Sequence, residues 1–202
     1  MDECLSLQNT VWNISGTNTV HHTFVLWMVL GAIGAFICLI QGVLWYFQPR
    51  NYYRRLARQH MKKVLKAPNV DTQIGLLHKC HYLVFEELVV LIFSRCRQVK
   101  HCRSTPYTRD GGFDGFARIK IDGAYRRAGI QSKRYTGYIN RKDLSRFRSV
   151  CSKRKLIPVF VFTGMISQAN LKYASDVGIY VINEDALLRV LITKDFRARG
   201  LE

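Results

Sequence analysis

An acid, an amide and a lysine lie on two short segments that should pair with each other. The glycine-rich turn DGGFDG delivers Asp114 to the start of the extended stretch FARIKI. A hairpin-favouring Asp-Gly turn follows, and the second extended stretch, AGIQSKRY, carries Gln131 and Lys133. Because side chains alternate along a strand, Gln131 and Lys133 project from one face. An antiparallel register would bring them to the same end of the hairpin as Asp114.

Two adjacent carboxylates, Glu86 and Glu87, lie on an apolar helix expected within residues 71–96. Neighbours on a helix point about 100° apart, so one of them can face the domain interior while the other faces solvent. The alternative is that both lie on the solvated side of an amphipathic helix. Asp114, Gln131 and Lys133 are candidate site residues, together with one of these two acids if it faces the interior.

The remaining segments alternate between helix and strand. Apolar runs without polar alternation are typical of strands buried in a parallel or mixed sheet. Ser167 and Asn183 are expected to cap two of the helices. The polar stretch 97–108 should hold the first strand. The other elements are helix 141–154, strand 158–164, helix 167–176, strand 178–183 and helix 184–196. This order predicts an α/β sandwich with a central mixed sheet.

The charge of the chain is unevenly distributed. The formal net charge is +17, and no Lys or Arg occurs before Arg50. From Arg50 onward the chain carries all 31 basic residues and 12 of the 14 acidic ones, a net charge of +19. Such an excess suits a polyanionic partner, which can be nucleic acid or an anionic membrane leaflet.

Residues 23–47 contain no charged side chain and are long enough to cross a bilayer core of about 30 Å. The basic stretch that follows keeps the C-terminal side in the cytoplasm by the positive-inside bias. We therefore expect a single-pass protein of a bacterial inner membrane, with its N-terminus outside. The expected parts are a short N-terminus at 1–22, a transmembrane helix at 23–47, a basic juxtamembrane helix at 48–70 that lies along anionic headgroups, and a soluble domain at 71–202.

Other interpretations of the N-terminal segment and of the cysteines are less favoured. A cleaved signal peptide would need a positive start and a shorter apolar stretch, and a core helix of this length would be unusual in so small a domain. Gly31 and Ala35 have the spacing that lets two membrane helices approach closely, which would give a homodimer. The six cysteines and their neighbouring histidines fit no structural zinc template.

The ordered motifs resemble the Mrr-type catalytic domain of the restriction-endonuclease-like, PD-(D/E)xK superfamily. The segments that carry the resemblance are FEELV, DGGFDG, IQSKRYTG, VFVFTG, SQANLKYA and IYVINEDALLRVL, and they span residues 75–192. The resemblance implies a restriction-endonuclease-like α/β sandwich with a central mixed sheet. One transmembrane helix would precede this nuclease domain.

The resemblance also implies roles for the four site residues. Asp114 matches the metal-binding aspartate, and Gln131 stands where the wider superfamily has Glu or Asp. Lys133 matches the lysine that positions or activates the attacking water. Glu86 matches the helical acid that supports the metal site, with Glu87 as the alternative. The implied cofactor is Mg²⁺ or Mn²⁺, which prefers such oxygen ligands.

The resemblance therefore implies a Mg²⁺-dependent DNA endonuclease held at a membrane, with restriction of foreign DNA as one setting. Basic side chains would follow the DNA backbone, and the residues expected to do so are Arg118, Lys120, Arg126, Arg127 and Arg134. One alternative is a catalytically inactive, nuclease-derived DNA-binding or assembly subunit of a conjugation or secretion apparatus. Another is a membrane-surface protein whose charge serves lipid alone.

Overall fold

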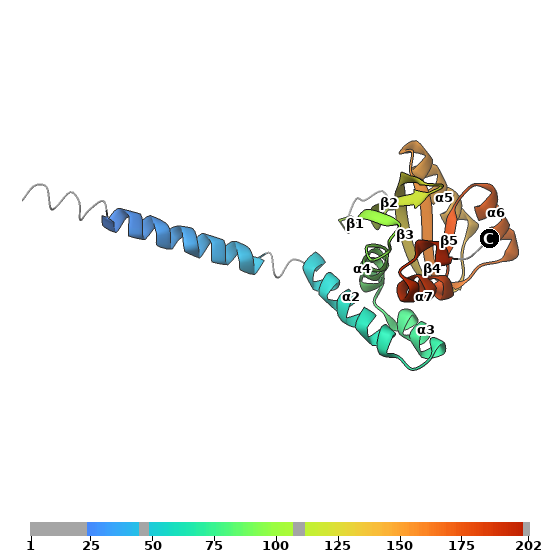
Figure 1. Ribbon diagram of the computed structural model, residues 1–202, viewed down its shortest axis with the longest axis horizontal. Helices are drawn as coiled ribbons and strands as arrows, with labels where there is room; N and C mark the ends of the chain where they lie inside the picture. Colours follow the sequence, from blue (N-terminus) through green and yellow to red (C-terminus); the bar gives the residue numbers. More distant parts are fainter. Residues whose placement is uncertain (1–23, 45–48, 107–111, 200–202) are drawn as a thin grey trace, which may run out of the picture. The chain divides into compact units, whose positions relative to one another are not determined.

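The computed structural model describes residues 24–44, 49–106 and 112–199 (Figure 1). The chain divides into two compact units, Met1–Gln48 and Pro49–Glu202. In the first unit, Phe24–Leu44 forms a helix of 21 residues with a mean hydropathy of 2.3 and no burial. Such a helix is about 31 Å long, which suits a membrane span but also a signal sequence. The remaining residues of the expected span, 23 and 45–47, lie outside the described residues.

The second unit contains a five-stranded sheet with helices on both faces (Figure 1). Its helices are α2 Pro49–Lys66, α3 Val70–Lys79, α4 Tyr82–Phe93, α5 Arg141–Lys153, α6 Gln168–Asp176, α7 Glu184–Thr193 and the 3-10 helix η1 Phe196–Arg199. Its strands are β1 Val99–Ser104, β2 Gly115–Ile121, β3 Ala124–Tyr138, β4 Ile157–Met165 and β5 Tyr180–Ile182.

The sheet has the order β1-β2-β3-β4-β5 and is mixed. Strands β1, β2 and β3 pair antiparallel, whereas β3, β4 and β5 pair parallel. The long strand β3 therefore joins an antiparallel half to a parallel half. This arrangement confirms the predicted α/β fold with a central mixed sheet and the restriction-endonuclease-like class. The polar stretch 97–108 does contain the first strand.

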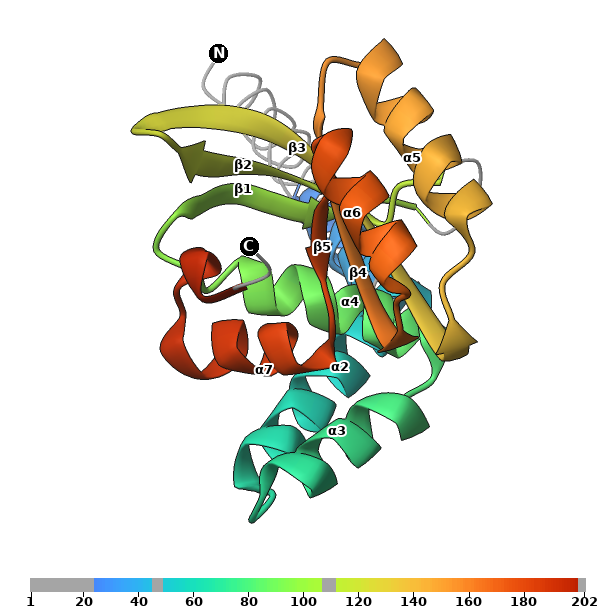
Figure 2. The ribbon, with the colours of Figure 1, turned by 90° about the vertical axis from the view of Figure 1, so that its right-hand side faces the viewer.

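Alternate residues of the central strands supply two separate cores. Ile130 of β3 and Val161 of β4 belong to the core beneath α4 and α7. Phe160 and Phe162 of β4 belong to the core beneath α5, where they join Phe147. Figure 2 shows α4 and α7 on one side of the sheet and α6 on the other. The core to which a strand residue belongs therefore shows which face of the sheet its side chain occupies. Because side chains alternate along a strand, the face of each polar side chain of the hairpin follows as well.

Side-chain caps begin three of the helices around the sheet. The Ser167 side chain accepts a hydrogen bond from the Asn170 backbone N–H at the start of α6. Asn183 does the same for Ala186 at the start of α7, at 2.9 Å. Both caps were predicted from the sequence. Asn140 caps α5 by accepting from the Lys142 N–H at 2.9 Å. Each cap satisfies a backbone donor that the helix itself cannot pair.

The helix expected within residues 71–96 is in fact two helices. Its first part, α3, ends at Lys79, and α4 begins at Tyr82. Cys80 and His81 between them are extended, with ψ angles of 139° and 141°. The His81 side chain caps α4 by accepting from the Leu83 N–H at 3.3 Å. This local cap competes with continuation of the helix.

The basic helix α2 packs against the domain. Its residues Ala57, Met61 and Val64 are at most 1% exposed and belong to the core beneath α4. The compact unit accordingly begins at Pro49, so it includes the helix that the sequence suggested as a juxtamembrane linker. The period of these three residues places them on one face of the helix.

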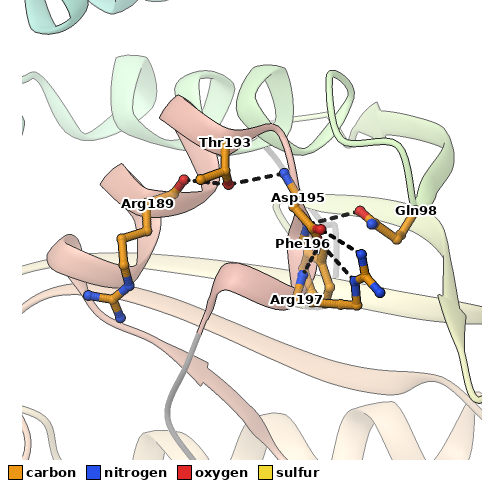
Figure 3. A network of polar contacts seen from close by, with 6 residues as sticks. All are labelled: Gln98, Arg189, Thr193, Asp195, Phe196 and Arg197. Carbon is orange, nitrogen blue, oxygen red and sulfur yellow. Dashed lines mark hydrogen bonds and ion pairs between the residues drawn. The ribbon is translucent and has the colours of Figure 1, made fainter.

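The C-terminal turn is fastened to the start of β1 (Figure 3). The Phe196 N–H donates to the Gln98 side-chain oxygen at 3.0 Å, and the Arg97 N–H donates to the Lys194 carbonyl at 3.1 Å. The Phe196 ring is buried edge-on against Phe93 of α4, with 5.4 Å between ring centroids. These contacts hold α7 and η1 against the edge of the sheet.

Candidate active site

The turn before β2 places Asp114 beside the middle of β3. The Asp114 N–H donates to the Ile130 carbonyl at 2.9 Å, which extends the β2–β3 ladder by one residue. On the other side, the Asp114 carbonyl accepts from the Thr105 N–H at 3.0 Å. The main chain of Asp114 is therefore held between the end of β1 and β3, in the register that the sequence predicted.

A buried ring fixes the turn from below. Phe113 is fully buried, and a Cβ on Gly129 of β3 would lie 2.4 Å from its Cε1 atom. Only glycine allows so close an approach of the ring to the strand. Since Phe113 directly precedes Asp114, the fit of its ring against Gly129 restricts where the acid can lie.

The Asp114 carboxylate is bound by Ser132. Its Oδ2 atom accepts from the Ser132 backbone N–H at 2.5 Å and from the Ser132 hydroxyl at 2.8 Å. Ser132 is 5% exposed and lies between Gln131 and Lys133 in the sequence. The carboxylate thus rests against the β3 backbone between those two residues. Nothing in the sequence marks Ser132 as a site residue beyond its position between Gln131 and Lys133.

Gln131 and Lys133 face the side of the sheet that carries α5. They stand opposite Phe160 and Phe162 of β4, whose rings belong to the core beneath α5. Both line a cavity of about 220 Å³. The other lining residues are Gly112, Asp143, Arg146, Phe147 and Val150. The prediction that Gln131 and Lys133 share a face is confirmed.

Asp143 and Arg146 of α5 were not predicted as site residues. The Tyr135 hydroxyl donates to the Asp143 carboxylate. Burial raises the pKa of Tyr135, and the hydrogen bond to Asp143 raises it further, so this hydroxyl remains a donor at neutral pH. The bond orients one carboxylate oxygen of Asp143, which lines the same cavity as Lys133.

The two acids of α4 have different environments. Glu87 is 4% exposed and pairs with Arg54 of α2, with 3.1 Å between Oε2 and Nε. Glu86 is half-buried and lies one helical turn before Val90. A Cβ on Gly115, the residue after Asp114, would lie 2.8 Å from Val90 Cγ2. Since residues i and i+4 share a helix face, Glu86 lies on the face of α4 that meets the start of β2. Glu87 thus points toward α2, whereas Glu86 lies on the face of α4 next to β2.

The donor set around the turn suits a hard divalent cation. Asp114 and Glu86 offer carboxylate oxygens and Gln131 offers an amide oxygen, which are ligands that Mg²⁺ and Mn²⁺ accept. Among the described residues, no group of three or more His, Cys, Asp or Glu side chains could hold a metal ion. A cation here would therefore depend on amide, carbonyl and water oxygens as well.

Burial governs the chemistry of the cysteines in the second unit. Desolvation raises the pKa of Cys80, Cys96, Cys102 and Cys151 to about 12 in each case. Thiols with such pKa values are protonated at neutral pH, so they are poor nucleophiles. These side chains behave as small apolar residues of the two cores.

A basic groove of about 740 Å³ lies on the antiparallel half of the sheet. Its lining contains four arginines and, among the described residues, no acid. The lining residues are His101, Cys102, Arg103, Phe116, Ala117, Arg118, Arg127, Ala128, Arg154 and Leu156. The Arg154 guanidinium lies 5.0 Å from the centre of the Phe113 ring. Phe113 therefore links the groove to the turn that carries Asp114.

The five basic residues expected to contact DNA are divided among four places. Arg118 and Arg127 are paired across β2 and β3, and both line the groove. Lys120 lines a neighbouring cavity of about 450 Å³. Arg126 projects to the opposite face from Arg127, because strand side chains alternate. Arg134 donates from Nη1 to the His78 carbonyl at 2.8 Å, at the end of α3.

A protein-family profile and one solved structure are similar to this chain. The profile of the Mrr catalytic domain, described as a restriction endonuclease, matches residues 77–191. No curated protein matches the chain significantly. The structure of the DNA modification-dependent restriction endonuclease AspBHI is similar, with a TM-score of 0.49 and 20% identity over 66% of this chain. The matched part is 38% of that protein's length.

The family match covers more than half of the chain and includes α4, the β2–β3 hairpin and the parallel strands. Asp114, Gln131 and Lys133 all fall within it. Restriction endonucleases hydrolyse phosphodiester bonds in DNA and typically use a divalent metal ion. The chain belongs to the Mrr-type restriction endonuclease family.

Proposed function

We propose that this protein is a membrane-anchored DNA endonuclease that requires a divalent metal ion, Mg²⁺ or Mn²⁺. The observation that supports the proposal most directly is the position of the Asp114 carboxylate. It is bound to the β3 backbone at Ser132, between Gln131 and Lys133. An acid fixed against the strand that carries Gln131 and Lys133 supports hydrolysis of an anionic diester.

Asp114, Glu86 and the Gln131 amide oxygen are the groups that would hold the ion. When bound, the ion would neutralise charge on the phosphate and favour ionisation of the attacking water. Ser132 would keep the Asp114 carboxylate oriented through its two hydrogen bonds. Because this carboxylate is oriented before the substrate reacts, the site needs less reorganisation during the reaction.

Lys133 supplies the positive charge of the proposed site. Its amine lines the same cavity as Gln131 and is exposed to solvent. There it can donate hydrogen bonds to a water molecule or to a phosphate oxygen, and it balances the negative charge that grows in the transition state. The same amine would be of little use in a site for an uncharged substrate.

The groove lined by Arg103, Arg118, Arg127 and Arg154 supports a path for the DNA backbone. Arg127 lines this groove and lies four residues before Gln131 and six before Lys133 along β3. Because alternate residues of a strand share a face, the groove lies on the same face of the sheet as Gln131 and Lys133. Guanidinium groups pair with phosphates in a bidentate manner. Arg154 of the groove lies over the buried Phe113 ring, so a strand that follows these arginines would come close to the turn that carries Asp114.

The helix Phe24–Leu44 supports the membrane anchor. Its length, its apolar composition and the basic residues that follow it favour a span with the C-terminal unit in the cytoplasm. An anchored endonuclease would act only on DNA that reaches the membrane, and restriction of incoming DNA is one setting of that kind.

The test is cleavage of plasmid DNA by the full chain in detergent micelles, with Mg²⁺ and with EDTA. We expect nicking or cutting with Mg²⁺ only, and its loss in Lys133→Met. Lys172→Met on α6, an exposed lysine outside the cavity, is the control. Salt-sensitive DNA binding by the native chain without any cleavage would instead favour a non-catalytic DNA-binding or assembly subunit.

A further inference from the structure

Helix α2 has one face fixed to the domain. Ala57, Met61 and Val64 are buried, and the His60 ring is 3.0 Å from the Leu76 carbonyl of α3. Arg54 completes this face by pairing with Glu87. The inward face is therefore fully used by contacts with α3 and α4.

The outward face of α2 is strongly basic. Arg58, Lys62 and Lys66 are exposed and are spaced four residues apart, so they form a row along the helix. Lys63 is exposed beside them, and the whole helix contains no acidic residue. Leu65 and Tyr52 are 45% and 50% exposed. A basic face with exposed apolar and aromatic side chains is typical of a helix that lies at a lipid interface.

The two basic surfaces of the second unit lie on opposite sides of the sheet. Figures 1 and 2 both show α4 between α2 and the strands. The arginine groove and the cavity of Lys133 are on the other face, together with α5. A DNA duplex lying on the catalytic face would therefore not reach the outward face of α2. The charge of α2 needs a different anionic partner.

The chain itself brings α2 to a membrane surface. Only residues 45–48 separate the apolar helix from Pro49, and a chain of that length spans at most about 18 Å. If Phe24–Leu44 crosses the bilayer, the first turn of α2 begins within that distance of the headgroups. Anionic lipids then meet a row of four cations at short range.

We infer that the outward face of α2 rests on anionic lipid headgroups and so directs the DNA groove away from the membrane. The inference rests on the proposed membrane anchor and not on catalysis. It assigns the two basic surfaces to two polyanions, lipid for α2 and DNA for the groove. The protein could then bind DNA through the groove while α2 stays in contact with the lipid headgroups.

The test uses the full chain in lipid nanodiscs, with a photo-cross-linking amino acid in place of the exposed Gln59. Nanodiscs of phosphatidylcholine alone are compared with nanodiscs containing phosphatidylglycerol. We expect at least about tenfold more lipid adduct with the anionic lipid, from the attraction of several basic residues to it. Lys62→Glu with Lys63→Glu should abolish the excess. Lys153→Glu with Lys172→Glu, which changes the charge equally on α5 and α6, should retain it.

Three results would overturn the inference. The first is an equal adduct yield in the two nanodiscs, and the second is an equal loss of adduct in the two double variants. The third is loss of the adduct when DNA is added before irradiation. A chain that neither nanodisc retains would refute the anchor as well. Plasmid cleavage is measured on the same samples. If cleavage is absent from every sample while the anionic excess persists, the endonuclease proposal fails and the lipid contact stands.

Discussion

Arg54 of α2 and Glu87 of α4 form an ion pair that also reaches the end of β1. The Arg54 Nε is 3.1 Å from Glu87 Oε2, and its Nη2 donates to the Ser104 hydroxyl at 2.9 Å. Ser104 pairs with Gly115 in the β1–β2 ladder, and the next residue, Thr105, bonds to Asp114. One guanidinium thus joins the basic helix to the strand end beside the proposed catalytic acid.

Removing this guanidinium should destabilise the second unit. Arg54→Ala would leave the Glu87 carboxylate buried without its partner. We expect a loss of about 2 kcal/mol, less than for a fully buried pair, because water screens a partly exposed partner. The measurement is urea unfolding of the full chain in micelles, followed by near-ultraviolet circular dichroism.

Two further variants separate the ion pair from the helix that carries it. Arg58→Ala, an exposed residue of the same helix, should change stability by less than about 0.5 kcal/mol. Arg54→Met combined with Glu87→Met should be less harmful than Arg54→Ala, because no charge stays buried alone. Equal losses in Arg54→Ala and Arg58→Ala would contradict this account of the pair.

The contact between Gly129 and Phe113 gives a second prediction. Gly129→Ala would place a Cβ 2.4 Å from the Phe113 ring and force it to move. We expect a loss of stability of about 1–3 kcal/mol, as for other overpacked cores. DNA cleavage should fall as well, because Phe113 directly precedes Asp114. Gly137→Ala on the same strand has no atom within 4 Å of the new Cβ and should be neutral. If Gly129→Ala cuts DNA at the native rate, the ring does not position the acid.

The groove arginines should determine the salt dependence of DNA binding. Arg118→Ala with Arg127→Ala should weaken binding of unrelated duplexes to a similar extent. It should also reduce the slope of log K against log salt by about 2, if each arginine contacts one phosphate. Fluorescence anisotropy over a series of salt concentrations measures both. Arg126→Ala, on the opposite face of the same strand, is the control. An equal effect of Arg126→Ala would show that DNA does not follow the groove.

Four cysteines of the second unit give a prediction on pH. Their pKa values of about 12 in the folded state lie above the value of 9.0 for an exposed thiol. The unfolded chain therefore loses these protons first as pH rises above 9, so the free energy of unfolding should fall between pH 9 and 12. Below pH 9 this contribution should not vary. Thermal unfolding from pH 7 to 10.5 measures the effect. Rapid alkylation of these thiols in the folded chain at pH 8 would contradict their burial.

The hairpin and the sheet could be predicted because their signals are local. The DGGFDG turn, the Asp-Gly turn and the alternation in AGIQSKRY determine where Asp114, Gln131 and Lys133 lie. Apolar runs at β4 and β5 predicted the parallel strands in the same way. The caps at Ser167 and Asn183 were also readable from single residues.

Contacts between distant segments could not be read from the sequence. Arg54 and Glu87 are 33 residues apart, and nothing local marks them as partners. The basic composition of α2 favoured a purely surface role, yet Ala57, Met61 and Val64 on one face of the helix are buried. The division of the basic residues between two faces of the sheet likewise depends on the register of β3. Ser132 reads as an ordinary strand residue until Asp114 is placed beside it.

Cleavage of supercoiled plasmid by Asp114→Asn tests the central claim most directly. This variant keeps the shape of the side chain and the Ser132 contacts can largely persist, but the charge needed to hold a cation is lost. The account predicts that the native chain cuts the plasmid in Mg²⁺, that Asp114→Asn lowers the rate by at least about a hundredfold, and that both bind DNA with similar affinity. Cleavage by Asp114→Asn at the native rate would contradict it.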